Sequence, residues 1–102
     1  MSQSPVTCPH TPAGPPPPPR TPAGCEECLA IGGHWVHLRL CLSCGHVGCC
    51  DNSPGRHATK HFQSSHHPVM QSFEPGENWG WCYLEDRELG PFTPLRAAGR
   101  RG

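Results

Sequence analysis

Hydrophobic and polar residues alternate most clearly over residues 34–42, which read HWVHLRLCL. Val36, Leu38, Leu40 and Leu42 fall on one face of an extended chain, and Trp35, His37, Arg39 and Cys41 fall on the other. A two-residue period is typical of a half-buried β-strand. Gly45 then indicates a tight turn, and residues 46–49 a short returning strand.

The pattern changes to that of a helix after Ser53-Pro54, where a hydroxyl at the N-cap and proline at the first helical position favour a helix start. We expect this helix to run to about Ser64 and to be followed by a strand over residues 69–73 and a turn over 74–77. Residues 78–84 alternate again. They place Trp79, Trp81 and Tyr83 on one face, and Cys82 and Leu84 on the other.

Both ends of the chain differ in composition from this central part. Residues 1–24 contain nine prolines, five of them in the run 15–19, which predicts an extended polyproline segment. After Leu89 the chain returns to Gly, Pro, Ala and Arg. We therefore predict a Pro-rich segment over 1–24, a domain over 25–88 and a flexible tail over 89–102, with residues 8–10 docking onto the domain as metal ligands.

Composition adds a reason to look for cross-links. The 102 residues include 14 Pro and 12 Gly but also 8 Cys and 8 His, so a small apolar core needs additional stabilisation. Eight basic and eight acidic residues give no net charge, which argues against a nucleic-acid surface, although Arg96, Arg100 and Arg101 make the end locally basic. No run suits a membrane span or a signal peptide, so we expect a cytoplasmic protein whose cysteines bind metal.

The candidate metal ligands form an ordered series. Two Cys-x-x-Cys pairs are followed by one further cysteine and three histidines: Cys25, Cys28, Cys41, Cys44, Cys49, His57, His61 and His67. This spacing suits Zn²⁺, and eight ligands make two closed tetrahedral sites of the structural kind. Each structural zinc contributes on the order of 10–16 kcal/mol to folding.

Other interpretations of the cysteines remain open at this point. A disulfide framework is one, and a redox-active Cys-x-x-Cys is another, although the latter needs a βαβ unit that the pattern does not predict. His57 and His61 have the spacing of a zinc-protease helix. That chemistry requires a glutamate general base after the first histidine, where this chain has Ala58.

The order of these motifs resembles the ubiquitin-specific-protease (UBP) type zinc finger, a family found in deubiquitinases and in a ubiquitin-binding histone deacetylase. The matching motifs run from Cys8-Pro9-His10 through Cys41-Leu-Ser-Cys44-Gly45 and His57-Ala58-x-x-His61 to Trp81-Cys82-Tyr83. The chain is most similar to short, stand-alone bacterial members. The resemblance implies an α+β fold, in which a small twisted antiparallel sheet with zinc-bearing loops packs against one main helix.

The resemblance also implies which ligands share an ion. One zinc would take Cys25, Cys28, Cys49 and His57, and a second would take Cys41, Cys44, His61 and His67. Fuller members have a third site, for which Cys8, His10 and Cys82 match here while Glu85 stands at the last cysteine position. We therefore expect two zinc ions, with a third site as an open alternative. A metalloenzyme built on that third site is the competing hypothesis.

The family grips the free C-terminal Gly-Gly tail of ubiquitin between aromatic rings and an arginine. Trp81 and Tyr83 match the aromatic end of that pocket, but the arginine position is Asp51 and a second tryptophan position is Arg39. We expect a groove formed by Trp35, Arg39, Asp51, Trp81 and Tyr83. The predicted function is a non-enzymatic, zinc-binding module for an unidentified protein or peptide, with a ubiquitin or ubiquitin-like tail as the alternative ligand and no membrane partner. The aromatic residues could instead simply pack on the sheet.

Overall fold

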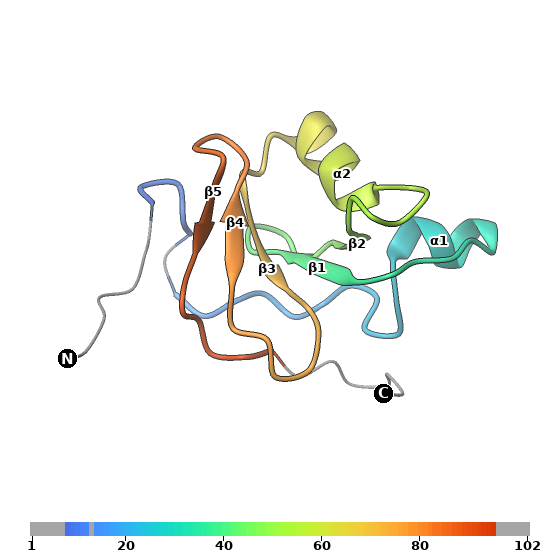
Figure 1. Ribbon diagram of the computed structural model, residues 1–102, viewed down its shortest axis with the longest axis horizontal. Helices are drawn as coiled ribbons and strands as arrows, with labels where there is room; N and C mark the ends of the chain where they lie inside the picture. The colour runs from blue at the N-terminus through green and yellow to red at the C-terminus, as the bar shows by residue number, and fades with distance from the viewer. Residues whose placement is uncertain (1–7, 13, 96–102) are drawn as a thin grey trace.

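The computed structural model describes residues 8–12 and 14–95. Its centre is a five-stranded antiparallel sheet in the order β2-β1-β3-β4-β5 (Figure 1). The strands are β1 (Leu38–Cys41), β2 (Val47–Cys49), β3 (Val69–Ser72), β4 (Gly80–Cys82) and β5 (Arg87–Leu89), and the helices are α1 (Glu26–Ile31) and α2 (His57–Ser65). The predicted α+β class, with an antiparallel sheet and one main helix, is confirmed.

The two faces of the sheet carry different side chains. Residues directly opposite one another in an antiparallel pair lie on the same face. Leu38 and Leu40 therefore share a face with their partners Cys49 and Val47, and all four are buried. Partly buried Trp35, Phe92 and Leu95 pack against this core. The opposite face carries Arg39, Met70 and Trp81, together with Gly48 beneath α2.

Two glycines allow close packing around β2. Gly45 has φ +83 in the turn before the strand, and a Cβ there would lie 2.3 Å from the carbonyl oxygen of Pro18. The Pro-rich segment thus crosses this turn, where Arg20 donates its backbone N–H to the Gly45 oxygen at 2.8 Å. At Gly48 a Cβ would lie 2.6 Å from the nitrogen of Ala58, so only glycine lets α2 approach the strand this closely.

The start of α2 differs from the prediction. The helix begins at His57, and Arg56 is its N-cap, in the left-handed region and without a side-chain hydrogen bond. Ser53, expected as the N-cap, is buried and accepts a hydrogen bond from the backbone N–H of Val36 at 2.8 Å. The first helical N–H, that of His57, instead donates to the sulfur of Cys49 at 3.3 Å.

The ends of the strands also differ from the pattern. The first strand begins at Leu38 rather than at residue 34, which leaves Val36 49% exposed. The sequence pattern indicated neither α1 nor β5. Leu89 is buried, and Phe92 and Leu95 pack on the core, so part of the segment predicted as a tail belongs to the packed structure. Arg96, Arg100 and Arg101 lie outside the described residues. Among the residues that the structure describes, none of the helices has the length and hydrophobicity needed to span a membrane.

Candidate metal centres and binding cavity

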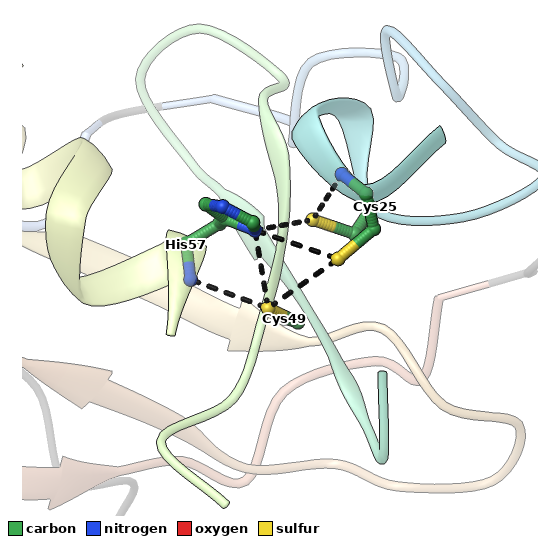
Figure 2. A group of neighbouring side chains, drawn as sticks. Cys25, Cys49 and His57 are labelled. Atoms are coloured by element: carbon green, nitrogen blue, oxygen red, sulfur yellow. Dashed lines mark hydrogen bonds between the residues drawn. The ribbon is translucent and has the colours of Figure 1, made fainter. Parts of the chain in front are cut away.

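The first cluster joins the starts of both helices to the end of β2. Cys25, Cys49 and His57 point toward one another in Figure 2, and Cys28 completes the group. The Nδ1 atom of His57 lies 3.3, 3.5 and 3.4 Å from the sulfurs of Cys25, Cys28 and Cys49. Tetrahedral zinc with Zn–S bonds of ~2.3 Å separates neighbouring ligand atoms by about 3.7 Å. The cluster therefore has nearly the dimensions of a zinc site.

The second cluster lies one helical turn further along α2. It contains Cys41, Cys44, His61 and His67, whose ligand atoms all lie within 4.8 Å of one another. The sulfur of Cys44 is 3.3 Å from Nε2 of His61, and that of Cys41 is 3.6 Å from Nδ1 of His67. Because His57 and His61 are four residues apart on α2, one helix supplies a ligand to each cluster.

A third, smaller cluster connects the N-terminal segment to β4. Cys8, His10 and Cys82 bring their ligand atoms within 4.8 Å of one another, with 3.8 Å between Sγ of Cys82 and Nδ1 of His10. Glu85, the expected fourth ligand, places a carboxylate oxygen 3.7 Å from that nitrogen. It does not belong to the three-membered group, and its other oxygen lies 3.8 Å from the guanidinium of Arg87. This cluster therefore has three close donors and one peripheral carboxylate.

The electrostatics of the clusters suit a divalent cation. Burial raises the pKa of Cys25 to about 12, and burial also raises the pKa values of Cys28, Cys41 and Cys82. Burial, reinforced by the neighbouring His46 and His67, lowers the pKa of His61 to about 4. Isolated thiolates are thus unfavourable here, whereas a metal ion displaces thiol protons and coordinates neutral imidazole. The donor sets of the first two clusters are those that structural zinc prefers.

Backbone N–H groups also donate hydrogen bonds to the sulfurs of the first cluster. The sulfur of Cys25 accepts from the N–H of Cys28 at 3.4 Å, and that of Cys49 accepts from the N–H of His57. Such bonds stabilise a thiolate and satisfy an N–H group at the start of each helix.

His46 links the first two clusters. Its buried Nε2 lies 2.8 Å from both carboxylate oxygens of Glu27, which stands between Cys25 and Cys28. The same ring stacks on His61, with 4.0 Å between centroids and planes 7° apart. The sequence pattern predicted only a short returning strand over residues 46–49. No spacing rule could find this contact, because it depends on how the loop before β2 approaches α1.

A cavity of about 470 Å³ opens on the α2 face of the sheet. Its lining residues are Arg39, Cys50, Asp51, Asn52, Met70, Trp79, Trp81, Tyr83, Asp86 and Glu88. Four of the five residues predicted for the groove are thus together, namely Arg39, Asp51, Trp81 and Tyr83. Trp35 is elsewhere, with its indole ring against Gly24. Because β1 begins only at Leu38, the alternation that placed Trp35 on the same face as Arg39 does not extend to residue 35.

Contacts within the wall hold the cavity residues in place. The guanidinium of Arg39 lies 4.5 Å from the centroid of the Trp79 ring. The Thr59 hydroxyl on α2 donates to Asp51 at 2.6 Å and lies 3.3 Å from the Tyr83 hydroxyl. Phe62 stacks on Tyr83 at 4.8 Å. Burial raises the pKa of Tyr83, with a smaller contribution from Asp51, so this phenol stays neutral.

Two acidic residues of the lining were not predicted. Asp86 lies in the turn between β4 and β5 with φ 53, and Glu88 is the cross-strand partner of Trp81. Residues 85–88 are four charged residues in a row (Glu, Asp, Arg, Glu), so the sequence carries no alternation that would identify a strand here. Cys50 belongs to none of the three clusters and is buried, with its sulfur 3.5 Å from the Ser53 hydroxyl.

Residues 25–92 match the family described as "Zn-finger in ubiquitin-hydrolases and other protein". The chain is 42% identical over 66 residues to ubiquitin carboxyl-terminal hydrolase 44 of Ailuropoda melanoleuca, a stretch that covers 61% of this chain and 8% of that protein. It is 34% identical over 71 residues to the NAD-dependent deacetylase sir2A of Dictyostelium discoideum, covering 70% of this chain and 12% of the relative. The chain therefore spans only a small part of these relatives.

A solved structure of similar size also matches. The solution NMR structure of protein RPA1320 from Rhodopseudomonas palustris has a TM-score of 0.75 and 45% sequence identity, covering 92% of this chain and 91% of that one. The matched region contains the first two Cys and His clusters in full. The chain therefore belongs to the UBP-type zinc-finger family and is a zinc-binding module.

Proposed function

We propose that this chain is a non-enzymatic interaction module that binds a protein or peptide segment in the cavity on the α2 face of the sheet. The observation that carries the proposal is the cavity itself, because about 470 Å³ with three aromatic side chains in its wall is within the size range of ligand sites. Reduced cysteines and zinc favour a cytoplasmic setting.

The metal clusters have a structural role in this proposal. Each of the first two clusters offers four protein donors, which leaves no coordination position for a substrate. None of the described residues that line the cavity belongs to a cluster. The clusters act on the cavity indirectly: Arg39 is two residues from Cys41, and Trp81 and Tyr83 flank Cys82 on either side.

A free C-terminal Gly-Gly tail is the alternative ligand. Names such as ubiquitin carboxyl-terminal hydrolase 44 among the relatives support it. Against it stands Asp51, whose carboxylate occupies the position where the family resemblance implies a tail-binding arginine. A terminal carboxylate would meet repulsion from Asp51 in place of attraction.

The test is a titration of zinc-loaded protein followed by NMR. Three short N-acetylated peptides are added separately: one with a central lysine and one with norleucine in its place, both amidated at the C-terminus, and one ending in a free Gly-Gly carboxylate. At least one should shift the resonances of Trp81 and Tyr83 below millimolar concentration, and Trp81→Ala should abolish the response. If none of the three shifts these resonances at several millimolar, the proposed function is wrong.

A further inference from the structure

The cavity walls carry an excess of negative charge. Three acidic residues, Asp51, Asp86 and Glu88, and one basic residue, Arg39, line it, which gives a formal charge of −2. The chain as a whole has no net charge. The excess is therefore local to the cavity and determines which ligands it favours.

Arg39 does not neutralise this charge by pairing with the acids. Its guanidinium lies over the Trp79 ring and donates a hydrogen bond to the backbone oxygen of Leu38 at 3.0 Å. Within the part of the chain that the structure describes, neither Asp86 nor Glu88 forms an ion pair or a hydrogen bond through its side chain. Two exposed carboxylates thus face the cavity without a cation.

An aromatic ring lies beside these carboxylates. Glu88 and Met70 are the cross-strand neighbours of Trp81, so all three side chains stand on one face of the sheet. Among the described residues, no ring or cation stacks on Trp81, whereas Arg39 covers Trp79 and Phe62 stacks on Tyr83. An aromatic face next to carboxylates attracts a cation both through the ring quadrupole and through charge.

We propose that the cavity binds a positively charged side chain, lysine or arginine, presented by a peptide segment. The cation lies against Trp81 and between the carboxylates of Asp86 and Glu88, while the rest of the cavity accepts the neighbouring backbone. Arg39 over Trp79 is an example of the same kind of contact within this wall. This inference rests on the proposed function, and it specifies the charge of the ligand.

The lysine and norleucine peptides described above test it directly, because they differ by one charge at nearly equal length. In 50 mM salt the lysine peptide should bind at least fivefold more tightly than the norleucine peptide. In 500 mM salt this difference in affinity should shrink, because the salt screens the charges. Equal binding of the two peptides, or tighter binding of the free Gly-Gly carboxylate, overturns the inference while leaving the proposed function intact. Absence of binding by all three overturns both.

Substitutions at the acidic residues test which carboxylates attract the cation. Exposed ion pairs each change a dissociation constant by a factor of roughly 1.5 to 5, so Asp86→Asn with Glu88→Gln should weaken lysine-peptide binding about five- to tenfold. Asparagine suits the left-handed backbone at residue 86, and both positions lie outside the four-ligand clusters. Glu26→Gln is the matched control, because Glu26 lies on α1, pairs with Arg20 and does not line the cavity. A dissociation constant that is unchanged in the double variant, or that the control raises equally, contradicts the proposal.

Discussion

Gly48→Ala tests whether the close approach of α2 to β2 sets the geometry of the metal clusters. Gly48 lies in the middle of β2, and an added Cβ would lie 2.6 Å from the nitrogen and 2.7 Å from the Cα of Ala58. Both contacts are with helix backbone, which cannot rotate away as a side chain can. The substitution must therefore move α2 or β2 as a unit.

The size of that movement follows from the distances. Ordinary contacts begin near 3.4 Å, so the helix must retreat by about 0.8 Å in a tightly packed interior. Zinc–ligand distances tolerate about 0.2 Å. Since Ala58 stands between His57 and His61, a rigid retreat of α2 displaces one ligand of the first cluster and one of the second. We expect about 1–3 kcal/mol of overpacking cost and a zinc affinity about 10- to 100-fold lower.

Competition with a chromophoric chelator measures the zinc affinity, and thermal unfolding of the zinc-loaded protein measures stability. Gly33→Ala is the matched control, because its Cβ would meet its nearest atoms at 3.5–3.6 Å, one of them the sulfur of Cys28. That variant should keep wild-type affinity. If Gly48→Ala resists the chelator as well as the wild type does, the helix does not couple the two clusters in the way proposed here.

Three further predictions concern metal, core and buried polar contacts. Stripping zinc with excess chelator at neutral pH should abolish the folded far-UV circular dichroism spectrum, since structural zinc contributes on the order of 10 kcal/mol to folding; an unchanged spectrum in metal-free protein would contradict this. Phe73→Ala, at a side chain 1% exposed, should lower the free energy of unfolding by about 3–5 kcal/mol in urea titrations. Ile31→Ala, 72% exposed, should be close to neutral, and equal losses would refute the assignment of the core. His46→Ala removes the bonds to Glu27 and the stack on His61, so chelator competition should show zinc binding about tenfold weaker; wild-type affinity would exclude a positioning role for His46.

The ligand series was predictable because metal binding constrains sequence spacing directly. Two cysteines separated by two residues reach one ion through a single turn, and two histidines four apart share a helix face, so Cys25 and Cys28 or His57 and His61 are recognisable without a structure. The partition into interleaved sets came from the family resemblance, and the structure brings the same sets together. Their action as zinc ligands stays a prediction that metal analysis can test.

Helix starts were less predictable, for a related reason. The rule that favours Ser53 as an N-cap assumes that a side-chain oxygen satisfies the first N–H groups. Here sulfurs accept these bonds, Cys25 for α1 and Cys49 for α2. Cysteine is not among the residues that the N-cap rule favours, so Cys25 directly before α1 gave no signal for that helix. Cys49 lies eight residues before His57, outside any local capping pattern, and α2 therefore begins later than expected.

Which residues line the cavity depends on strand pairing, and the alternation of polar and apolar residues in strands of three residues does not specify that pairing. The alternation predicts that Trp81 and Tyr83 share a face, and the family resemblance implies their place in the groove. Glu88 reaches the cavity only because β5 pairs with β4 and places it opposite Trp81. The metal clusters and the cavity are thus separable parts of the fold. Substitutions at the cluster cysteines and histidines would remove the metal that stabilises the domain, whereas Asp51, Asp86 and Glu88 line a partly open surface and bind no cluster. Ligand charge can therefore change within this fold without loss of its zinc sites. Comparison of E26Q with the double variant D86N/E88Q measures that independence, since both should retain wild-type zinc content while only the second should bind the cationic peptide more weakly.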